Sequence, residues 1–121
     1  MENRRRAERQ PALWIGSCNV EGESSDLWRD CAIFDVSALG VGIDLRYPGA
    51  SDLQSRRITL LLGVGPSIDV TVTGEVRNTK SGPDDIVQAG IEFVGLTESE
   101  RSFVDLVERR AMSRSRAGQS H

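Results

Sequence analysis

The chain has 121 residues, of which 38% are hydrophobic and 27% charged, and its net charge at pH 7 is −3. This length suits one domain with its own core, and the composition is that of a globular protein rather than a disordered one. A net negative chain lacks the basic face of a general nucleic-acid binder. The longest apolar run, 58–64, is far shorter than the roughly 20 residues that cross a bilayer. The charged N-terminus is not followed by the apolar stretch of a secretory signal, so we expect a cytoplasmic protein without membrane contact.

Arginine is concentrated at the two ends of the chain, in 4–9 and 109–116, and Lys80 is the one lysine among 15 cationic residues. The planar donor fork of arginine matches phosphate and the acceptor edge of guanine, so the N-terminal cluster indicates a specific anionic ligand. The alternative is a solvated tail. Residues 1–10 show no apolar periodicity and precede Pro11, which predicts a flexible arm.

Six runs between residues 12 and 93 have the character of β-strands. They cover about 13–20, 27–34, 41–45, 57–62, 70–77 and 87–93, with polar or glycine-rich loops between them, including 47–51. In the first run, the order of Leu13, Ile15, Cys18 and Val20 predicts a bulge near Gly16. The run at 70–77 alternates most regularly and should have one solvent-exposed face. In the run at 87–93, one face should carry the apolar residues Val87, Ala89, Ile91 and Phe93. Six strands joined by short turns predict an antiparallel barrel or a compact sheet.

One helix is expected after the last strand. Thr97 and Glu100 have the spacing of a capping box, which marks a helix start. Apolar residues at i, i+3 and i+4 follow, so a helix over about 98–111 would lay one face on the strands. These residues are Phe103, Leu106 and Val107. Residues 113–121 are small, polar and basic, and we expect a disordered tail there.

The sequence offers little for catalysis, so we expect no enzyme. The one histidine is the terminal His121, and Ser37 has no identifiable general base beside it. Gly63 and Gly65 are followed by proline and a strand, not by a helix whose N-terminus could hold a phosphate. The two cysteines, Cys18 and Cys31, lie in strand-like runs, and we expect buried thiols rather than a disulfide or a zinc site.

A polar stretch, 35–40, separates the second and third expected strands. Side chains two apart on a strand share a face, so Asp35 and Ser37 would present a carboxylate and a hydroxyl side by side. Gly40 can adopt a positive φ or let a ligand touch the backbone. Asp, Ser and Gly are also common turn residues, and the stretch taken alone is more simply a turn.

Together with the N-terminal arginines, this stretch resembles the two-part motif of PilZ domains, R-x-x-x-R followed by D/N-x-S-x-x-G. The first part is Arg5-Arg6-Ala7-Glu8-Arg9 and the second is Asp35-Val36-Ser37-Ala38-Leu39-Gly40. The end of the chain, 89–109, is also similar to the closing strand and helix of the family. The resemblance implies an all-β fold with a C-terminal helix, a six-stranded antiparallel PilZ-type β-barrel over 11–112, preceded by the arm 1–10.

The resemblance implies that the domain binds cyclic di-GMP, the bacterial second messenger, and needs no other cofactor. Arg5 and Arg9 would contact its phosphates and the Hoogsteen edge of guanine. Asp35 and Ser37 would pair with polar atoms of a guanine or with the arm, and Gly40 would permit close approach. Weaker candidates for ligand contact are Arg4 and Arg6. Arg46 and Arg77 are also weaker candidates, and the simpler alternative for both is a solvated strand residue.

Arg4 immediately precedes the first motif. In the PilZ family, an arginine at that position accompanies an intercalated pair of ligands, whereas an apolar residue accompanies a single molecule. The resemblance therefore predicts two cyclic di-GMP molecules per chain.

Three functions are compatible with these residues. The first is a non-catalytic bacterial cyclic di-GMP receptor whose arm closes over the ligand and alters contact with an unidentified downstream protein. The second is a ligand-independent adaptor of the same fold that acts through protein contacts in motility or pilus assembly. The third is a small-barrel binder of single-stranded nucleic acid, which would need aromatic residues on a basic sheet face. Three Phe, one Tyr and two Trp supply little of that, so no nucleic-acid partner is expected.

Overall fold

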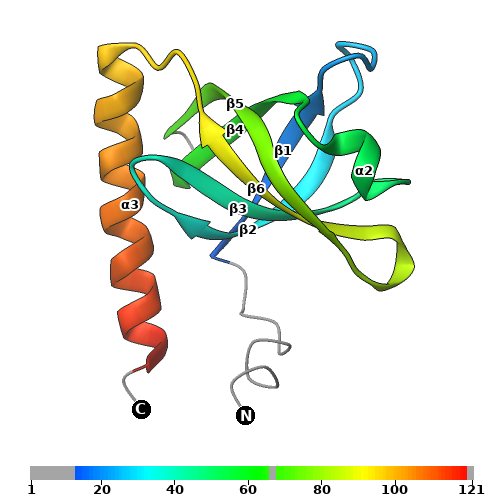
Figure 1. The fold of residues 1–121 in the computed structure, drawn as a ribbon. Coiled ribbons are helices and arrows are strands. Elements are labelled where there is room, and N and C mark those ends of the chain that lie inside the picture. Colours follow the sequence, from blue (N-terminus) through cyan, green and yellow to red (C-terminus); the bar gives the residue numbers. More distant parts are fainter. Residues whose placement is uncertain (1–12, 66–67, 120–121) are drawn as a thin grey trace.

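Six strands close into an antiparallel barrel in the computed structural model, which describes residues 13–65 and 68–119 (Figure 1). The strands are β1 (Trp14–Val20), β2 (Arg29–Val36), β3 (Gly40–Arg46), β4 (Arg57–Gly65), β5 (Ile68–Ser81) and β6 (Ile86–Phe93). Their order around the barrel is β1-β2-β3-β6-β5-β4, and β4 pairs again with β1. The predicted barrel is therefore confirmed. The arm, 1–10, lies outside the described residues.

Alternating side chains of the strands fill the barrel. On β5, Val72 and Val76 are buried while Thr71 and Arg77 are exposed, so the predicted solvent-exposed face is confirmed. The predicted inner face of β6 is buried in the same way. Its fully buried members are Val87, Ala89 and Ile91. Regular alternation thus determines which side chains remain outside for a ligand.

The predicted bulge in β1 is wrong. β1 pairs with β2 without a register shift from Trp14 to Cys18. Trp14 packs against the core, and the apolar residue that points out is Ile15, which is 71% exposed. Gly16 lies on the inner side because the Cδ1 atom of Ile33 stands 2.9 Å from where its Cβ would be. A large neighbouring side chain, not a backbone irregularity, accounts for the glycine.

The connections contain more regular structure than the sequence predicted. β4 continues to Gly65, where a register shift against β5 lies between Gly63 and Gly65. The expected loop at 47–51 instead leads into the short helix α2 (Ala50–Leu53), whose Leu53 is buried in the core. A single 3-10 turn, η1 (Pro83–Asp85), precedes β6.

The helix α3 (Glu98–Gln119) lies along one side of the barrel (Figure 1). The predicted capping box is confirmed, because the Thr97 N–H donates to Oε1 of Glu100 over 2.9 Å and the Glu100 N–H donates to Oγ1 of Thr97 over 3.1 Å. The residues that α3 buries are Val104, Val107 and Ala111. The helix extends past the predicted end at 111, because methionine, arginine, alanine and glutamine all favour helix even without apolar periodicity.

Within the described part of the chain, no helix is both long and apolar enough to span a membrane.

Candidate functional site

The connection between β2 and β3 is a tight turn organised by Ser37. The Ser37 N–H donates to the Gly40 carbonyl over 2.9 Å. The Ser37 Oγ accepts from the N–H groups of Leu39 and Gly40, over 3.2 and 3.3 Å. The hydroxyl that the motif supplies is thus engaged by the turn itself, which fixes the end of β2 where Asp35 lies.

Gly40 allows β3 to pack closely on β6. It pairs with Glu92, and a Cβ at Gly40 would collide with the carbonyl oxygen of Ile91. This close approach of the protein's own backbone requires a glycine whatever its φ. The approach of a ligand to Gly40 remains a prediction.

A bulge in β2 turns two successive side chains outward. The register with β3 shifts between Ile33 and Asp35, so Phe34 is the extra residue. The Cβ position of Gly42 lies 3.0 Å from Cε1 of Phe34 and 3.4 Å from Cβ of Asp35, so both side chains lie beside that glycine. Asp35 is exposed, and no hydrogen bond or ion pair is found for its carboxylate within residues 13–65 and 68–119. A ligand role for this carboxylate stays a prediction.

The chain enters the barrel beside this bulge. The Leu13 N–H donates to the Ile33 carbonyl over 2.7 Å, two residues before Asp35. The predicted ligand arginines of the first motif, and Arg4 before it, lie outside the described residues. Those of the motif are Arg5, Arg6 and Arg9. Leu13 thus ties the start of the described chain to the strand that carries the second motif.

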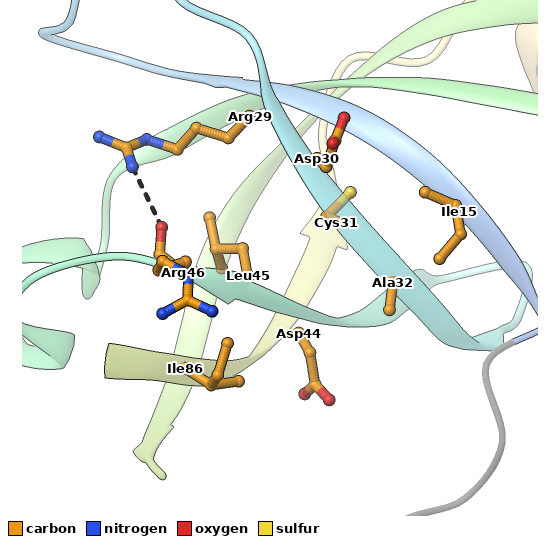
Figure 2. Close-up of a pocket in the computed structure, with 9 residues that line it drawn as sticks. All are labelled: Ile15, Arg29, Asp30, Cys31, Ala32, Asp44, Leu45, Arg46 and Ile86. Carbon is orange, nitrogen blue, oxygen red and sulfur yellow. Dashed lines mark hydrogen bonds between the residues drawn. The ribbon is translucent and has the colours of Figure 1, made fainter. Parts of the chain in front are cut away.

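A pocket of about 420 Å³ opens on the barrel at β2 and β3 (Figure 2). Its lining residues are Ile15, Arg29, Asp30, Cys31, Ala32, Asp44, Leu45, Arg46 and Ile86. Figure 2 shows Asp44 and Arg46 extending from one side of β3, with Leu45 on the other. Asp44 is only 8% exposed and stands directly opposite Ala32. We did not predict Asp44 from the sequence, although alternation along β3 places it on the outer face.

A model of the PilZ domain matches residues 3–109 of the chain. The chain belongs to the PilZ domain family. The resemblance seen in the two motifs is therefore confirmed, and it places the chain in a family of cyclic di-GMP receptors whose domains are typically non-catalytic.

Among solved structures, the PilZ domain is similar to MrkH of K. pneumonia in its apo state, with a TM-score of 0.62 and 12% sequence identity. The likeness covers 93% of this chain and 53% of MrkH, so the chain spans about half the length of that protein. At this identity the likeness shows the fold alone. No curated protein matches the chain in sequence.

Two weaker candidates of this PilZ domain make contacts with the protein itself. The Arg77 Nε lies 2.6 Å from Oε1 of Glu92, and its Nη2 lies 3.4 Å from Oε1 of Glu75. These two glutamates face each other across β5 and β6, so Arg77 offsets their repulsion. The Nη1 of Arg46 donates to the Asp84 carbonyl over 2.8 Å. A guanidinium has five N–H donors, so both arginines have N–H groups that these contacts do not use.

Arg29, at the start of β2, has several partners in the barrel. Its Nε and Nη2 donate to the two carboxylate oxygens of Glu23 over 3.1 and 2.7 Å, and its Nη1 donates to the Arg46 carbonyl over 3.0 Å. The guanidinium also lies over the Tyr47 ring, 4.9 Å from its centroid. The hydrogen bond from Arg29 lowers the pKa of Glu23, and the same bond raises the pKa of Arg29. This arginine stabilises the end of the barrel.

The remaining reactive groups of the described residues include acidic side chains and two thiols. No group of three or more His, Cys, Asp or Glu side chains there could hold a metal ion. Cys18 and Cys31 are free and buried, as predicted. The hydrogen bond with Cys31 and burial both raise the pKa of the Cys18 thiol, which keeps it protonated and unreactive.

Proposed function

We propose that this PilZ domain is a non-catalytic receptor that binds cyclic di-GMP on the outer face of β2 and β3, beside the turn at Asp35–Gly40. The observation that carries the proposal is the hydrogen bond from Leu13 to Ile33, because it joins the chain that follows the first motif to the strand that holds the second. Family membership supplies the ligand class. The geometry supports placing both motifs at one ligand.

Chain length supports the same assignment. Arg9 lies four residues before Leu13, and four residues span at most about 14 Å when fully extended. Arg5 lies eight residues before Leu13, which allows at most about 29 Å. Because Leu13 is bonded next to the bulge, these limits leave Arg9 within reach of a ligand at Asp35, and Arg5 within reach of its far side.

The chemistry of the two motifs is complementary. Arg5 and Arg9 supply charged donor forks for the phosphates and for guanine O6 and N7, which are acceptors. The exposed carboxylate of Asp35 accepts from the N1–H and amino group of one guanine. Ser37 contributes mainly by fixing the turn, since its hydroxyl already bonds two amides. Arg4 beside the first motif supports binding of two ligand molecules.

Binding at this face would bring the N-terminal arm over the ligand. The arginines of the arm bind the phosphates and so hold the arm against the ligand. The closed arm presents a different surface to a downstream protein. That surface change, rather than a reaction, is the proposed output of the domain.

Titration calorimetry with cyclic di-GMP tests the proposal, with cyclic di-AMP and GTP as control ligands. Charged hydrogen bonds contribute about 1.5 to 3 kcal/mol, so Arg9→Ala and Arg5→Ala should each weaken binding roughly ten- to a hundredfold. Arg101→Ala, an exposed arginine on α3, is the matched control and should leave affinity unchanged. Thermal melting should be the same for all three variants.

One result would contradict the assignment, and another would contradict only the predicted ligand pair. Unchanged affinity for cyclic di-GMP in both Arg5→Ala and Arg9→Ala would show that the arm is not part of the binding site. Saturation of the wild-type chain at one ligand per chain would remove the predicted ligand pair while leaving the receptor function in place.

A further inference from the structure

Phe34, the extra residue of the β2 bulge, differs from the other phenylalanines in where it packs. The chain has three of them, and Phe93 and Phe103 pack against the core. Phe34 is not among the described side chains that do so, although it is half-buried. Groups on the outer surface of the barrel therefore cover part of its ring, and the ring does not serve to fill the core.

The Phe34 ring lies against Gly42 of β3. Its Cε1 and Cζ atoms stand 3.0 and 3.1 Å from the position that a Cβ of Gly42 would take. Gly42 pairs with Gly90 on β6, so two neighbouring strands have no side chain in this row. A side chain at position 42 would occupy the space of the ring. The glycine therefore allows the ring to approach the backbone of β3 closely.

The Asp35 side chain stands beside the same glycine. Its Cβ lies 3.4 Å from the Cβ position of Gly42, so Phe34 and Asp35 border one point on β3. The next residue, Val36, is buried, and the turn at Ser37 fixes the backbone that follows. A side chain with neighbours at its Cβ has fewer open rotamers than one in solvent. The ring thus limits the directions in which an exposed carboxylate can point.

We propose that Phe34 is a positioning residue for ligand binding: its ring, lying against Gly42, holds the Asp35 carboxylate in the orientation that accepts hydrogen bonds from the ligand. The inference rests on the proposed function and extends it to a residue outside both motifs. The ring acts through Asp35 and makes no contact with the ligand. If χ1 of Asp35 sampled three staggered wells instead of one, about a third of the molecules would be competent, and the dissociation constant would rise about threefold.

Titration calorimetry of Phe34→Ala with cyclic di-GMP measures the effect of the ring. Affinity should fall roughly three- to tenfold, because both the side chain of Asp35 and the backbone of the bulge gain freedom. Phe103→Ala removes the same ring from α3, where it packs against the core, and is the matched control. It should lower the free energy of unfolding in urea at least as much as Phe34→Ala does, and it should leave affinity unchanged.

A double-mutant cycle with Asp35→Ala distinguishes positioning from direct contact and from a structural role. Asp35→Ala should weaken cyclic di-GMP binding at least as much as Phe34→Ala, since orientation cannot contribute more than the oriented group. In the Asp35→Ala background, Phe34→Ala should change affinity by less than about twofold, because no carboxylate remains for the ring to hold.

Three results would count against the proposals. Equal losses of affinity from Phe34→Ala with and without Asp35 would show that the ring contacts the ligand or shapes the barrel, and would overturn the inference. Unchanged affinity in Phe34→Ala or in Asp35→Ala would overturn it as well. Failure of the wild-type chain to bind cyclic di-GMP would overturn the proposed function, and this inference with it.

Gly42→Ala tests the same contact from β3 and replaces Phe34→Ala if that variant does not fold. The φ of Gly42 is not positive, so alanine can adopt its backbone conformation, and the new methyl group would displace the ring by a few tenths of an ångström. Affinity should fall at least about twofold, and this loss should disappear in the Asp35→Ala background. A folded Gly42→Ala variant with wild-type affinity would show that the ring does not set the orientation of Asp35.

Discussion

The two ends of β2 use polar side chains in different ways. At its start, Arg29 has its charge paired with Glu23, and its Nη1 donates to the Arg46 carbonyl. At its end, the Ser37 hydroxyl is bound within the turn, but the Asp35 carboxylate is exposed and has no bond among the described residues. The same strand therefore carries an arginine that serves the fold and a carboxylate that no described residue engages.

This contrast shows that residue type alone does not identify a site. Arginine is the preferred partner of phosphate, yet the two-point bond of Arg29 to Glu23 leaves it little capacity for an anion. A single exposed carboxylate is common on any surface. Asp35 is a better candidate because the turn and the bulge fix its position. The folded strands therefore supply the free energy that holds this side chain in place.

The largest expected effect comes from Gly40, which supports the turn end of β2. In Gly40→Ala the new methyl group would collide with the Ile91 carbonyl oxygen and force β3 away from β6. We expect a loss of about 2 to 3 kcal/mol in the free energy of unfolding, measured with urea. Gly82→Ala is the control, because φ there is −124° and the nearest atom to the new Cβ is the Ile86 oxygen at 3.2 Å. A Gly82 variant as unstable as the Gly40 variant would refute this account.

Ser37 and Asp35 should separate stability from binding. Ser37→Ala removes the acceptor of two backbone amides at the turn and should cost about 1 kcal/mol in the free energy of unfolding. Asp35→Asn changes an exposed side chain and should alter stability by less than about 0.5 kcal/mol while weakening cyclic di-GMP binding. Urea unfolding and calorimetry on both variants measure the two effects. If Asp35→Asn destabilised the barrel as much as Ser37→Ala, the carboxylate would be a structural group.

The smallest expected effect concerns the Arg29 end. Arg29 lowers the pKa of Glu23 below its ordinary value of 4.5, so the ionised carboxylate favours the folded state. This contribution is present above pH 4.5 and is lost as the pH falls through the lowered pKa of the folded protein. Between pH 7 and pH 3, the wild type should therefore lose slightly more stability than Glu23→Gln. If the melting temperatures of the two proteins fell by the same amount across that pH range, the Arg29–Glu23 ion pair would contribute nothing to stability.

The sequence predicted the parts of the fold in which each residue follows a simple period. Alternation located the inner faces of β5 and β6, and the capping box located the start of α3. Prediction from the sequence failed where a residue distant in the sequence determines the local structure. The side chain of Ile33 explains Gly16, and no local pattern in β1 reveals it. The end of α3 was placed too early because apolar periodicity stops before the helix does.

The candidate site was predicted only in part for the same reason. Asp35, Ser37 and Gly40 form a local motif, and they lie together at one turn. Asp44 and Ala32 meet only because β2 and β3 pair in this register, and Phe34 reaches Gly42 only through the bulge. Contacts made by strand pairing depend on register, and the pattern within one strand does not reveal which residue of the next strand lies opposite.

The bulge at Phe34 affects which register β2 and β3 adopt when the barrel folds. A slip of β2 by one residue against β3 would turn Asp35 into the core and Val36 out to water. The wrong pairing would also lose the fit of Phe34 and Asp35 beside Gly42. Residues at the candidate site thus also select the correct strand register during folding. A substitution there can lower the yield of folded protein even when the final structure tolerates it.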